Sequence, residues 1–347
     1  MPHRFFTWHN RVMNPTPPTQ TQWLPDILGP GFESLPLELP SGDRATLVRY
    51  LPRVDNHPSR GVPHLNSVPQ VELDSTAVLY IHGWSDYFYN RDLARFWTHM
   101  GAHFYAVDLR NYGRNLDLSD PERTPGLIDN LGAYDEEISA SLDVITGLHP
   151  HCRVVLNAHS TGGLTAALWA NDNPGRITGL VLNSPWLEFQ YTASVRKLLG
   201  PLMAARNPVS PLRIALPNYY VLAVAQAHGD TPFDLRLKPP ESFPVYPQFL
   251  RAVFDGHRRV EHGLSLDIPV LVQMSRTSMQ SVNYAPQMAH ADIVLDVDIL
   301  ARRALDLADT VIVDRVPGAM HDVYLSEETV RDQAFIRIMQ FARGYLD

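Results

Sequence analysis

Short apolar runs alternate with helix-like stretches along most of the chain. Each run is continuous and rich in Val, Ile or Leu, which is typical of strands buried on both faces. The runs are Ala77–Ile81, Phe104–Val107, Val154–Leu156, Leu180–Leu182, Val270–Gln273 and Val311–Val313. The stretches between them carry apolar residues at helical spacing, as Tyr134, Ile138, Leu142 and Ile145 do. This alternation predicts an α/β fold with a mostly parallel central sheet and helices on both faces.

Two further runs lie near the N-terminus. Leu35–Leu39 and Ala45–Leu51 flank Ser41-Gly42-Asp43, and glycine is favoured in the tight turns that join antiparallel strands. The runs therefore predict an antiparallel hairpin. The preceding residues 1–33 are rich in Pro, Gln and Thr and show little periodicity, so we expect an extended lead-in over the surface.

Residues 186–263 interrupt the strand and helix rhythm with prolines, aromatic residues and aliphatic clusters. An insertion at this point would lie above the carboxyl ends of the strands, where open α/β sheets bind ligands. We therefore expect a cap or lid over an α/β core that is formed by residues 34–185 and 264–347.

The length and charge of the chain limit its class. Its 347 residues suit one large α/β domain with an insertion. A net charge of −8 without a basic stripe argues against nucleic acid or an anionic membrane surface as a partner. The N-terminus lacks the apolar core of a signal peptide, and no run reaches the ~18 apolar residues of a membrane span. One cysteine, Cys152, fits a reducing compartment. We expect a soluble, cytoplasmic protein with no integral membrane segment; nothing in the pattern specifies an oligomeric state.

The segment from Val154 to Gly163 carries the strongest chemical signal. A β-branched run precedes Ser160, small residues flank it at Ala158 and Gly162, and a helix-forming stretch follows. In a nucleophile elbow, a tight strand-to-helix turn with small residues two positions away leaves the serine hydroxyl exposed. The alternative is a serine that caps an ordinary helix. Because the strand and the helix are both predicted, we favour Ser160 as a nucleophile.

A serine nucleophile needs a base, and His321 is the best placed of the 15 histidines. It lies in a glycine-containing loop directly after Val311–Val313, and loops at the carboxyl ends of strands often carry catalytic groups. His159 is predicted to pack beneath the elbow. Asp322, which follows the proposed base, is predicted to be solvated or structural.

The carboxylate that holds the histidine is expected after the preceding strand, in the chain order Ser, acid, His. Asp292, Asp296 and Asp298 all follow Val270–Gln273, after an unusually long loop. Asp298 has the pattern of a helix cap and Asp296 that of a turn residue. We therefore favour Asp292 and keep the other two as alternatives.

An oxyanion hole is also needed, because the tetrahedral intermediate places negative charge on the former carbonyl oxygen. One donor is expected to be the N–H of Thr161, directly after the nucleophile. The second is expected to be the N–H of Trp84, which follows His82-Gly83 after the first buried run; a plain turn is the alternative there.

Metal and nucleotide sites have little support. His149, His151 and Cys152 are close in sequence, but their spacing matches no standard zinc site. The chain has no phosphate-binding loop and no G-x-G-x-x-G motif. We therefore expect no metal and no cofactor.

Taken together, these motifs resemble the α/β-hydrolase family, in its branch of serine aminopeptidases S33, lysophospholipases and monoacylglycerol lipases. The resemblance covers residues 35–346, and the matching segments are Ile81–Trp84, Asp108–Arg114, Ala158–Gly162 and Gly318–Asp322. It implies Ser160 as nucleophile, His321 as base, Asp292 as acid through the family's D-x-V, and Trp84 and Thr161 as oxyanion donors. The chain departs from the pattern at Ala158, where glycine is commoner, and at residues 275–291, which separate the acid from its strand.

We therefore expect a serine hydrolase that cleaves carboxylic esters through an acyl-enzyme on Ser160, with a small-molecule acyl ester as substrate. The apolar cap favours acyl chains over peptides, and an acyl pocket could be lined by Trp186, Leu187, Phe189, Leu198, Leu202 and Met203. The alternatives are an S33-type aminopeptidase or amidase, for which Glu188 could hold a substrate amine, and a non-catalytic small-molecule binder on the same fold. Acyl transfer to an alcohol other than water also remains open.

Overall fold

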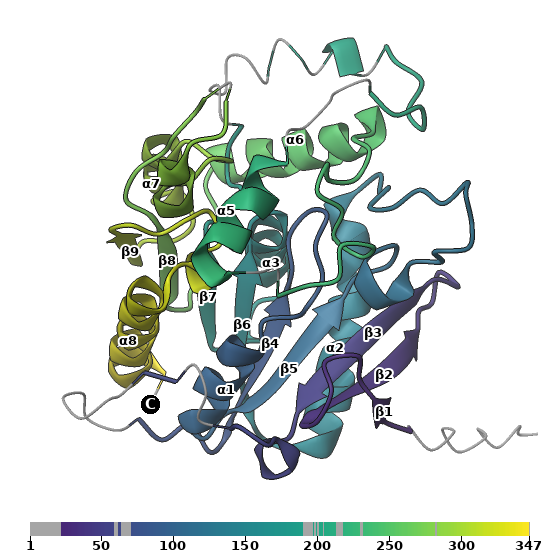
Figure 1. Ribbon diagram of the computed structural model, residues 1–347. Coiled ribbons are helices and arrows are strands. Elements are labelled where there is room, and N and C mark those ends of the chain that lie inside the picture. Colours follow the sequence, from purple (N-terminus) through teal and green to yellow (C-terminus); the bar gives the residue numbers. More distant parts are fainter. Residues whose placement is uncertain are drawn as a thin grey trace, which may run out of the picture.

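The computed structural model describes residues 22–58, 62–63, 71–189, 197, 199, 201–203, 205–212, 218–229, 232–281 and 283–346. In these residues the strands form one nine-stranded sheet in the order β1-β2-β3-β5-β4-β6-β7-β8-β9. Neighbouring strands from β5 to β9 are parallel, whereas β1, β2 and β3 pair antiparallel. The predicted α/β fold with a mostly parallel sheet is confirmed (Figure 1). The strands are β1 Leu24–Pro25, β2 Phe32–Glu38, β3 Arg44–Tyr50, β4 Thr76–Ile81, β5 His103–Asp108, β6 Arg153–His159, β7 Gly179–Asn183, β8 Val270–Ser275 and β9 Val311–Val316.

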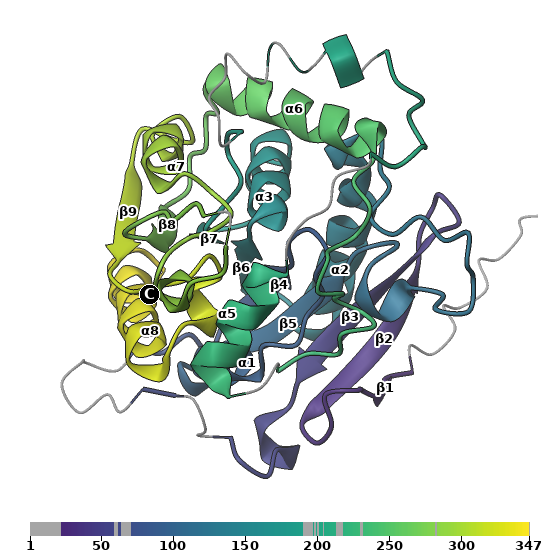
Figure 2. The ribbon, with the colours of Figure 1, turned by 45° about the horizontal axis from the view of Figure 1, so that its top comes forward.

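Helices cover both faces of the sheet (Figures 1 and 2). Alternate residues of a strand face opposite sides, so in β4 Leu79 joins one hydrophobic core and Val78 the other. The first core contains Ile138 of α2 and Leu164 of α3, and the second contains Trp97 of α1. None of the described helices has both the length and the apolar composition of a membrane span. The α-helices are α1 Arg91–His99, α2 Asp135–Leu148, α3 Thr161–Asp172, α5 Tyr219–His228, α6 Pro247–Glu261, α7 Val297–Ala304 and α8 Glu328–Tyr345, and the short 3-10 helices are η1 Pro52–Val54, η2 Gly113–Asn115, η3 Leu131–Tyr134, η4 Pro286–His290 and η5 Val323–Leu325.

The antiparallel edge of the sheet starts earlier in the chain than expected. β2 and β3 form the predicted hairpin, with Leu35 opposite Leu47. β1 adds an edge strand in which Leu24 pairs with Ser34. β1 and the start of β2 fall within residues 1–33, so the lead-in is shorter than we predicted. The sequence did not reveal β1 because a strand of two residues is too short to show periodicity. Residues 1–21 lie outside the described part of the chain.

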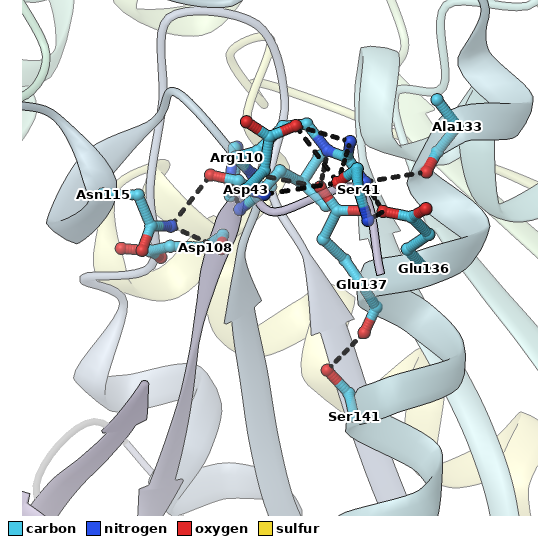
Figure 3. Close-up of polar contacts among 11 residues, drawn as sticks. Ser41, Asp43, Asp108, Arg110, Asn115, Ala133, Glu136, Glu137 and Ser141 are labelled. Carbon is cyan, nitrogen blue, oxygen red and sulfur yellow. Dashed lines mark hydrogen bonds and ion pairs between the residues drawn. The ribbon is translucent and has the colours of Figure 1, made fainter. Parts of the chain in front are cut away.

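Arg110, in the loop after β5, joins the turn between β2 and β3 to the start of α2 (Figure 3). Its guanidinium binds Glu137 at 2.6 and 2.8 Å, Glu136 at 2.7 Å and Asp43 at 2.8 Å. Glu137 is fully buried and also accepts from the backbone N–H of Arg110. The hydrogen bond to Glu137 raises the pKa of Arg110, against the opposing effect of burial, so the guanidinium stays charged. This group of residues is a structural joint at the carboxyl end of β5.

The segment between β7 and β8 contains α5 and α6, and α6 packs directly on α3. A Cβ on Gly256 of α6 would lie 3.0 Å from Leu168 and 3.2 Å from Leu164 of α3. The missing side chain therefore lets the two helices approach closely. Both views show α6 lying across α3 (Figures 1 and 2).

Candidate active site

The serine of the predicted elbow lies between β6 and α3 in a strained conformation. Ser160 has a φ of 53° and a ψ of −119°, which residues other than glycine rarely adopt. Backbone of this kind costs on the order of 1–3 kcal/mol and is concentrated at functional sites. A Cβ on Gly83 would lie 3.0 Å from the Cβ of Ser160, and one on Gly163 would lie 2.7 Å from Pro185. The turn therefore depends on small neighbours.

Gly162→Ala is expected to destabilise the protein by about 1–3 kcal/mol, as overpacking does, and to lower its activity. A Cβ at this position would overlap the backbone carbonyl oxygen of His82, so the loop after β4 would have to move. Gly147→Ala in α2 is the matched control, because a Cβ there meets nothing within 4 Å; helix propensity then predicts a gain of about 0.5–1 kcal/mol. Urea unfolding and activity assays of both variants measure these effects. Wild-type stability and turnover in Gly162→Ala would contradict the close contact.

The structure brings Ser160, His321 and Asp292 together. Nε2 of His321 lies 3.1 Å from Oγ of Ser160, and Nδ1 lies 2.9 Å from Oδ2 of Asp292. All three residues are buried. A carboxylate can only accept, so Nδ1 carries the proton and Nε2 is left free to accept the serine proton. This is the geometry of a nucleophile, a base and an orienting acid.

Asp292 reaches this position although residues 276–291 separate it from β8. It forms an isolated parallel β-bridge with Ser278. The N–H of Asp292 donates to the carbonyl of Thr277 at 2.9 Å, and the N–H of Met279 donates to the carbonyl of Asp292 at 2.8 Å. Its Oδ1 accepts from the N–H groups of Val294 and Leu295 at 2.8 and 2.7 Å. Backbone hydrogen bonds therefore hold both the main chain of Asp292 and its carboxylate in place.

The other aspartates near the predicted acid have structural positions. Asp296 caps α7 and accepts from the N–H groups of Asp298 and Ile299, each at 3.0 Å, so the roles predicted for Asp296 and Asp298 were wrong. Asp298 is exposed on the first turn of α7 and pairs with Arg315 at 2.7 Å. Asp322 is buried and accepts from Asn183 at 2.7 Å. It is structural, and the solvated alternative was wrong.

The loop after β4, residues 82–89, contains the predicted oxyanion donor Trp84, and for that prediction we name it the oxyanion loop. His82 fixes its start, because Nε2 accepts from the N–H of Leu109 at 3.0 Å and Nδ1 therefore donates to the carbonyl of Gly83 at 2.8 Å. Burial lowers the pKa of His82, which favours this neutral form. Gly83 lies against Ser160, so the next residue, Trp84, is close to this serine. Thr161 is the first residue of α3, and its N–H has no partner within the helix.

The residues expected to line an acyl pocket are spread over several environments. The N–H of Trp186 donates to the carbonyl of Ser160 at 2.9 Å, which places Trp186 beside the elbow. Leu187 is fully buried in the first core, and the ring of Phe189 lies edge-on to Phe254 of α6 at 5.4 Å. Leu202 is 55% exposed, Met203 is partly buried, and Leu198 lies outside the described residues.

A second charged group, beside Ser160, His321 and Asp292, was missed from the sequence. Asp86, in the oxyanion loop, binds Nζ of Lys238 at 2.6 Å and lies 3.5 Å from Nδ1 of His159. The ring of His159 lies 5.0 Å from that of His321. Burial alone would raise the pKa of Asp86, but the Lys238 ammonium and then His159 hold it well below its usual range. No sequence motif connects two residues that are 152 positions apart.

The described residues contain no group of three or more His, Cys, Asp or Glu side chains placed to hold a metal ion. His149 instead stacks on His103 with 3.6 Å between ring centroids and hydrogen-bonds the hydroxyl of Tyr105 at 2.8 Å. His149, one of the three residues considered for a zinc site, thus packs against His103 and Tyr105.

A strained serine after a parallel strand, with the histidine and aspartate in reach, is the arrangement of the α/β-hydrolase fold, and the similar solved structures show that this chain has that fold. Residues 74–230 match the model of the family described as serine aminopeptidase, S33. The resemblance found in the sequence is therefore confirmed over these residues.

Relatives with named activities are similar to this chain in sequence or in structure. A monoglyceride lipase homolog of Monkeypox virus is 27% identical over 117 residues, and the match covers 34% of this chain and 40% of that protein. A soluble variant of monoglyceride lipase from Saccharomyces cerevisiae has a TM-score of 0.59 at 15% identity and covers 91% of this chain and 96% of its own. A carboxyl esterase from Bacillus coagulans has a TM-score of 0.60 at 14% identity over 91% and 99%. At these identities the solved structures show the fold.

Proposed function

We propose that the protein is a serine hydrolase that cleaves carboxylic esters, in the manner of a monoacylglycerol lipase or lysophospholipase. The observation that carries the proposal is the continuous set of hydrogen bonds from Ser160 through His321 to Asp292. The named relatives support it, because two of them are monoglyceride lipases or homologs of one and the third is a carboxyl esterase.

In the proposed reaction, His321 accepts the proton of Ser160 while Oγ attacks the ester carbonyl. The N–H groups of Trp84 and Thr161 stabilise the negative charge on the former carbonyl oxygen. His321 then gives its proton to the leaving alcohol, which leaves an acyl group on the serine. A water molecule then attacks the acyl carbonyl while the same imidazole takes its proton, and the imidazolium returns that proton to Oγ of Ser160 as the carboxylic acid leaves. Asp292 stabilises the imidazolium in both steps. No metal or cofactor takes part in this scheme.

Esters are proposed in preference to aminoacyl amides because Glu188 is already engaged. It binds Arg303 of α7 at 3.0 Å and is buried, so it is poorly placed to hold a substrate amine as an aminopeptidase would require. We also propose that residues 186–263 form a cap over the site. The closeness of Trp186 to Ser160 supports this placement, as does the packing of α6 on α3.

The test combines a fluorophosphonate probe with a substrate panel. Wild type and Ser160→Ala are treated with the probe and read by intact mass, and wild type is then assayed on short to long acyl esters and on aminoacyl amides. Labelling of wild type alone, followed by ester turnover, is the expected result. Turnover of amides without esters would favour the aminopeptidase, and no labelling of either protein would favour a non-catalytic binder.

A further inference from the structure

The oxyanion loop is bonded to one segment of the chain between β7 and β8. Four consecutive residues take part, and each contacts a residue between 234 and 243. The pairs are Trp84 Nε1 to Ser242 Oγ at 3.1 Å, Phe243 N to Ser85 Oγ at 3.0 Å, Lys238 Nζ to Asp86 Oδ1 at 2.6 Å and Asp234 N to Tyr87 OH at 2.8 Å. The ring of Trp84 also stacks on Phe249 with 3.8 Å between centroids. The 234–243 segment and the oxyanion loop therefore form one packed unit.

Lys238 makes the ionic contact among these four. Lys238 is only 5% exposed, and its ammonium also lies 3.2 Å from the hydroxyl of Tyr89. Three aromatic rings surround it at 5.0 to 5.3 Å, those of Tyr220, Tyr89 and Phe233. A buried ammonium is tolerated only with a counter-charge and close partners. Asp86 is thus the counter-charge that allows the Lys238 ammonium to be buried.

Asp86 is close to the catalytic groups on its other side. Its Oδ2 lies 3.5 Å from His159, whose ring is 5.0 Å from that of His321. The same loop contacts the nucleophile at Gly83, three residues earlier. A displacement of Asp86 would therefore move the backbone that carries the N–H of Trp84.

We propose that Lys238 is a positioning residue for the reaction, which holds the oxyanion loop against Ser160 by binding Asp86; this rests on the proposed ester hydrolysis. Without the ammonium, the buried carboxylate has lost its counter-charge, and the loop has to shift to hydrate it. The N–H of Trp84 then no longer meets the developing oxyanion. Because that charge exists only in the transition state, the loss falls on kcat and leaves KM nearly unchanged.

Lys238→Ala is the test. A misplaced donor lowers kcat by about 10- to 100-fold, with KM within about threefold of wild type. Propylammonium, which replaces the three methylene groups and the ammonium lost in the variant, restores part of the rate. 1-Propanol, which has the same number of heavy atoms, does not, because the cavity needs a charge. Lys197→Ala is the control, since Lys197 forms an exposed pair with Glu261 at 3.1 Å in the same part of the chain; it keeps wild-type kcat.

Two measurements read the positioning role without an ester substrate. The rate of fluorophosphonate labelling of Ser160 is expected to fall about tenfold in Lys238→Ala, because that reaction also uses the oxyanion donors, and hydrogen exchange of residues 82–89 is expected to rise. Wild type that labels but turns over no ester would overturn the proposed function alone. Labelling of the variant at the wild-type rate would overturn the role of Lys238, even with faster exchange. If Lys238→Ala does not fold, Lys238→Met is used instead, because it keeps most of the lysine's aliphatic volume while still leaving Asp86 without its counter-charge, and it is expected to label as slowly.

Discussion

Asp292→Asn is expected to lower kcat for ester hydrolysis by about 10⁴-fold, as loss of the carboxylate does in a triad. Oδ1 of Asp292 accepts from the N–H groups of Val294 and Leu295, so the carbonyl oxygen of the asparagine remains there. Its NH₂ group is then directed at Nδ1 of His321. An NH₂ group donates, so the imidazole must carry its proton on Nε2, where it can no longer accept the proton of Ser160.

Asp296→Asn and Asp298→Asn are the matched controls for this change. Asn caps a helix about as well as Asp, so the first keeps α7, and the second removes only an exposed pair with Arg315. Both are expected to retain kcat within about twofold, since surface changes are usually worth within ±0.5 kcal/mol. Steady-state kinetics on one soluble ester, with thermal unfolding of each variant, decides the matter. A large loss of kcat in Asp298→Asn together with an active Asp292→Asn would show that Asp298, and not Asp292, is the acid.

Arg110→Met is expected to lower the free energy of unfolding by about 3–5 kcal/mol, because removing one partner leaves a buried charge unpaired. Glu137 is fully buried and takes two hydrogen bonds from the guanidinium (Figure 3). The same guanidinium holds Asp43 of the β2–β3 turn and Glu136. The change therefore weakens the junction of the hairpin, β5 and α2 at once.

Urea unfolding measures the loss of stability in Arg110→Met, and the exposed Arg44–Glu38 ion pair serves as the control. Arg44 and Glu38 are paired at 3.1 Å with side chains 72% and 70% exposed, and Arg44→Met is expected to change stability by about 0–1 kcal/mol. Adding Glu137→Leu to Arg110→Met should recover part of the loss, since the unpaired charge is gone. Equal destabilisation by Arg110→Met and Arg44→Met would show that burial of Glu137 contributes nothing.

The parts of the fold that the sequence predicts are those that local residues determine. A strand buried on both faces needs a continuous apolar run, so the strands from β4 to β8 were predictable. The apolar run Val311–Val313 also predicted β9, although this edge strand is only partly buried. Ser160 and His321 were predictable as candidates because each follows a strand and has glycine nearby. The structure places them together with Asp292, while their catalytic roles stay predictions.

The remaining features depend on residues that are distant in sequence. Asp322 is buried because Asn183, 139 positions away, donates to it, and Asp86 meets Lys238 only after the chain has folded. β1 is too short for a pattern, and the capping role of Asp296 depends on where α7 begins, which is the least certain part of sequence interpretation. These features arise from tertiary packing and have no local signal.

Because of the β-bridge between Ser278 and Asp292, the position of Asp292 does not depend on the length of the loop before it. Backbone hydrogen bonds to Thr277 and Met279 fix Asp292 directly, and lengthening a loop that is already closed costs only about 0.6 kcal/mol per doubling. Homologous chains can therefore insert or delete residues in this excursion and still present the same carboxylate. The number of residues between β8 and Asp292 is therefore free to vary, whereas Thr277, Ser278 and Met279 have to keep their backbone contacts with Asp292.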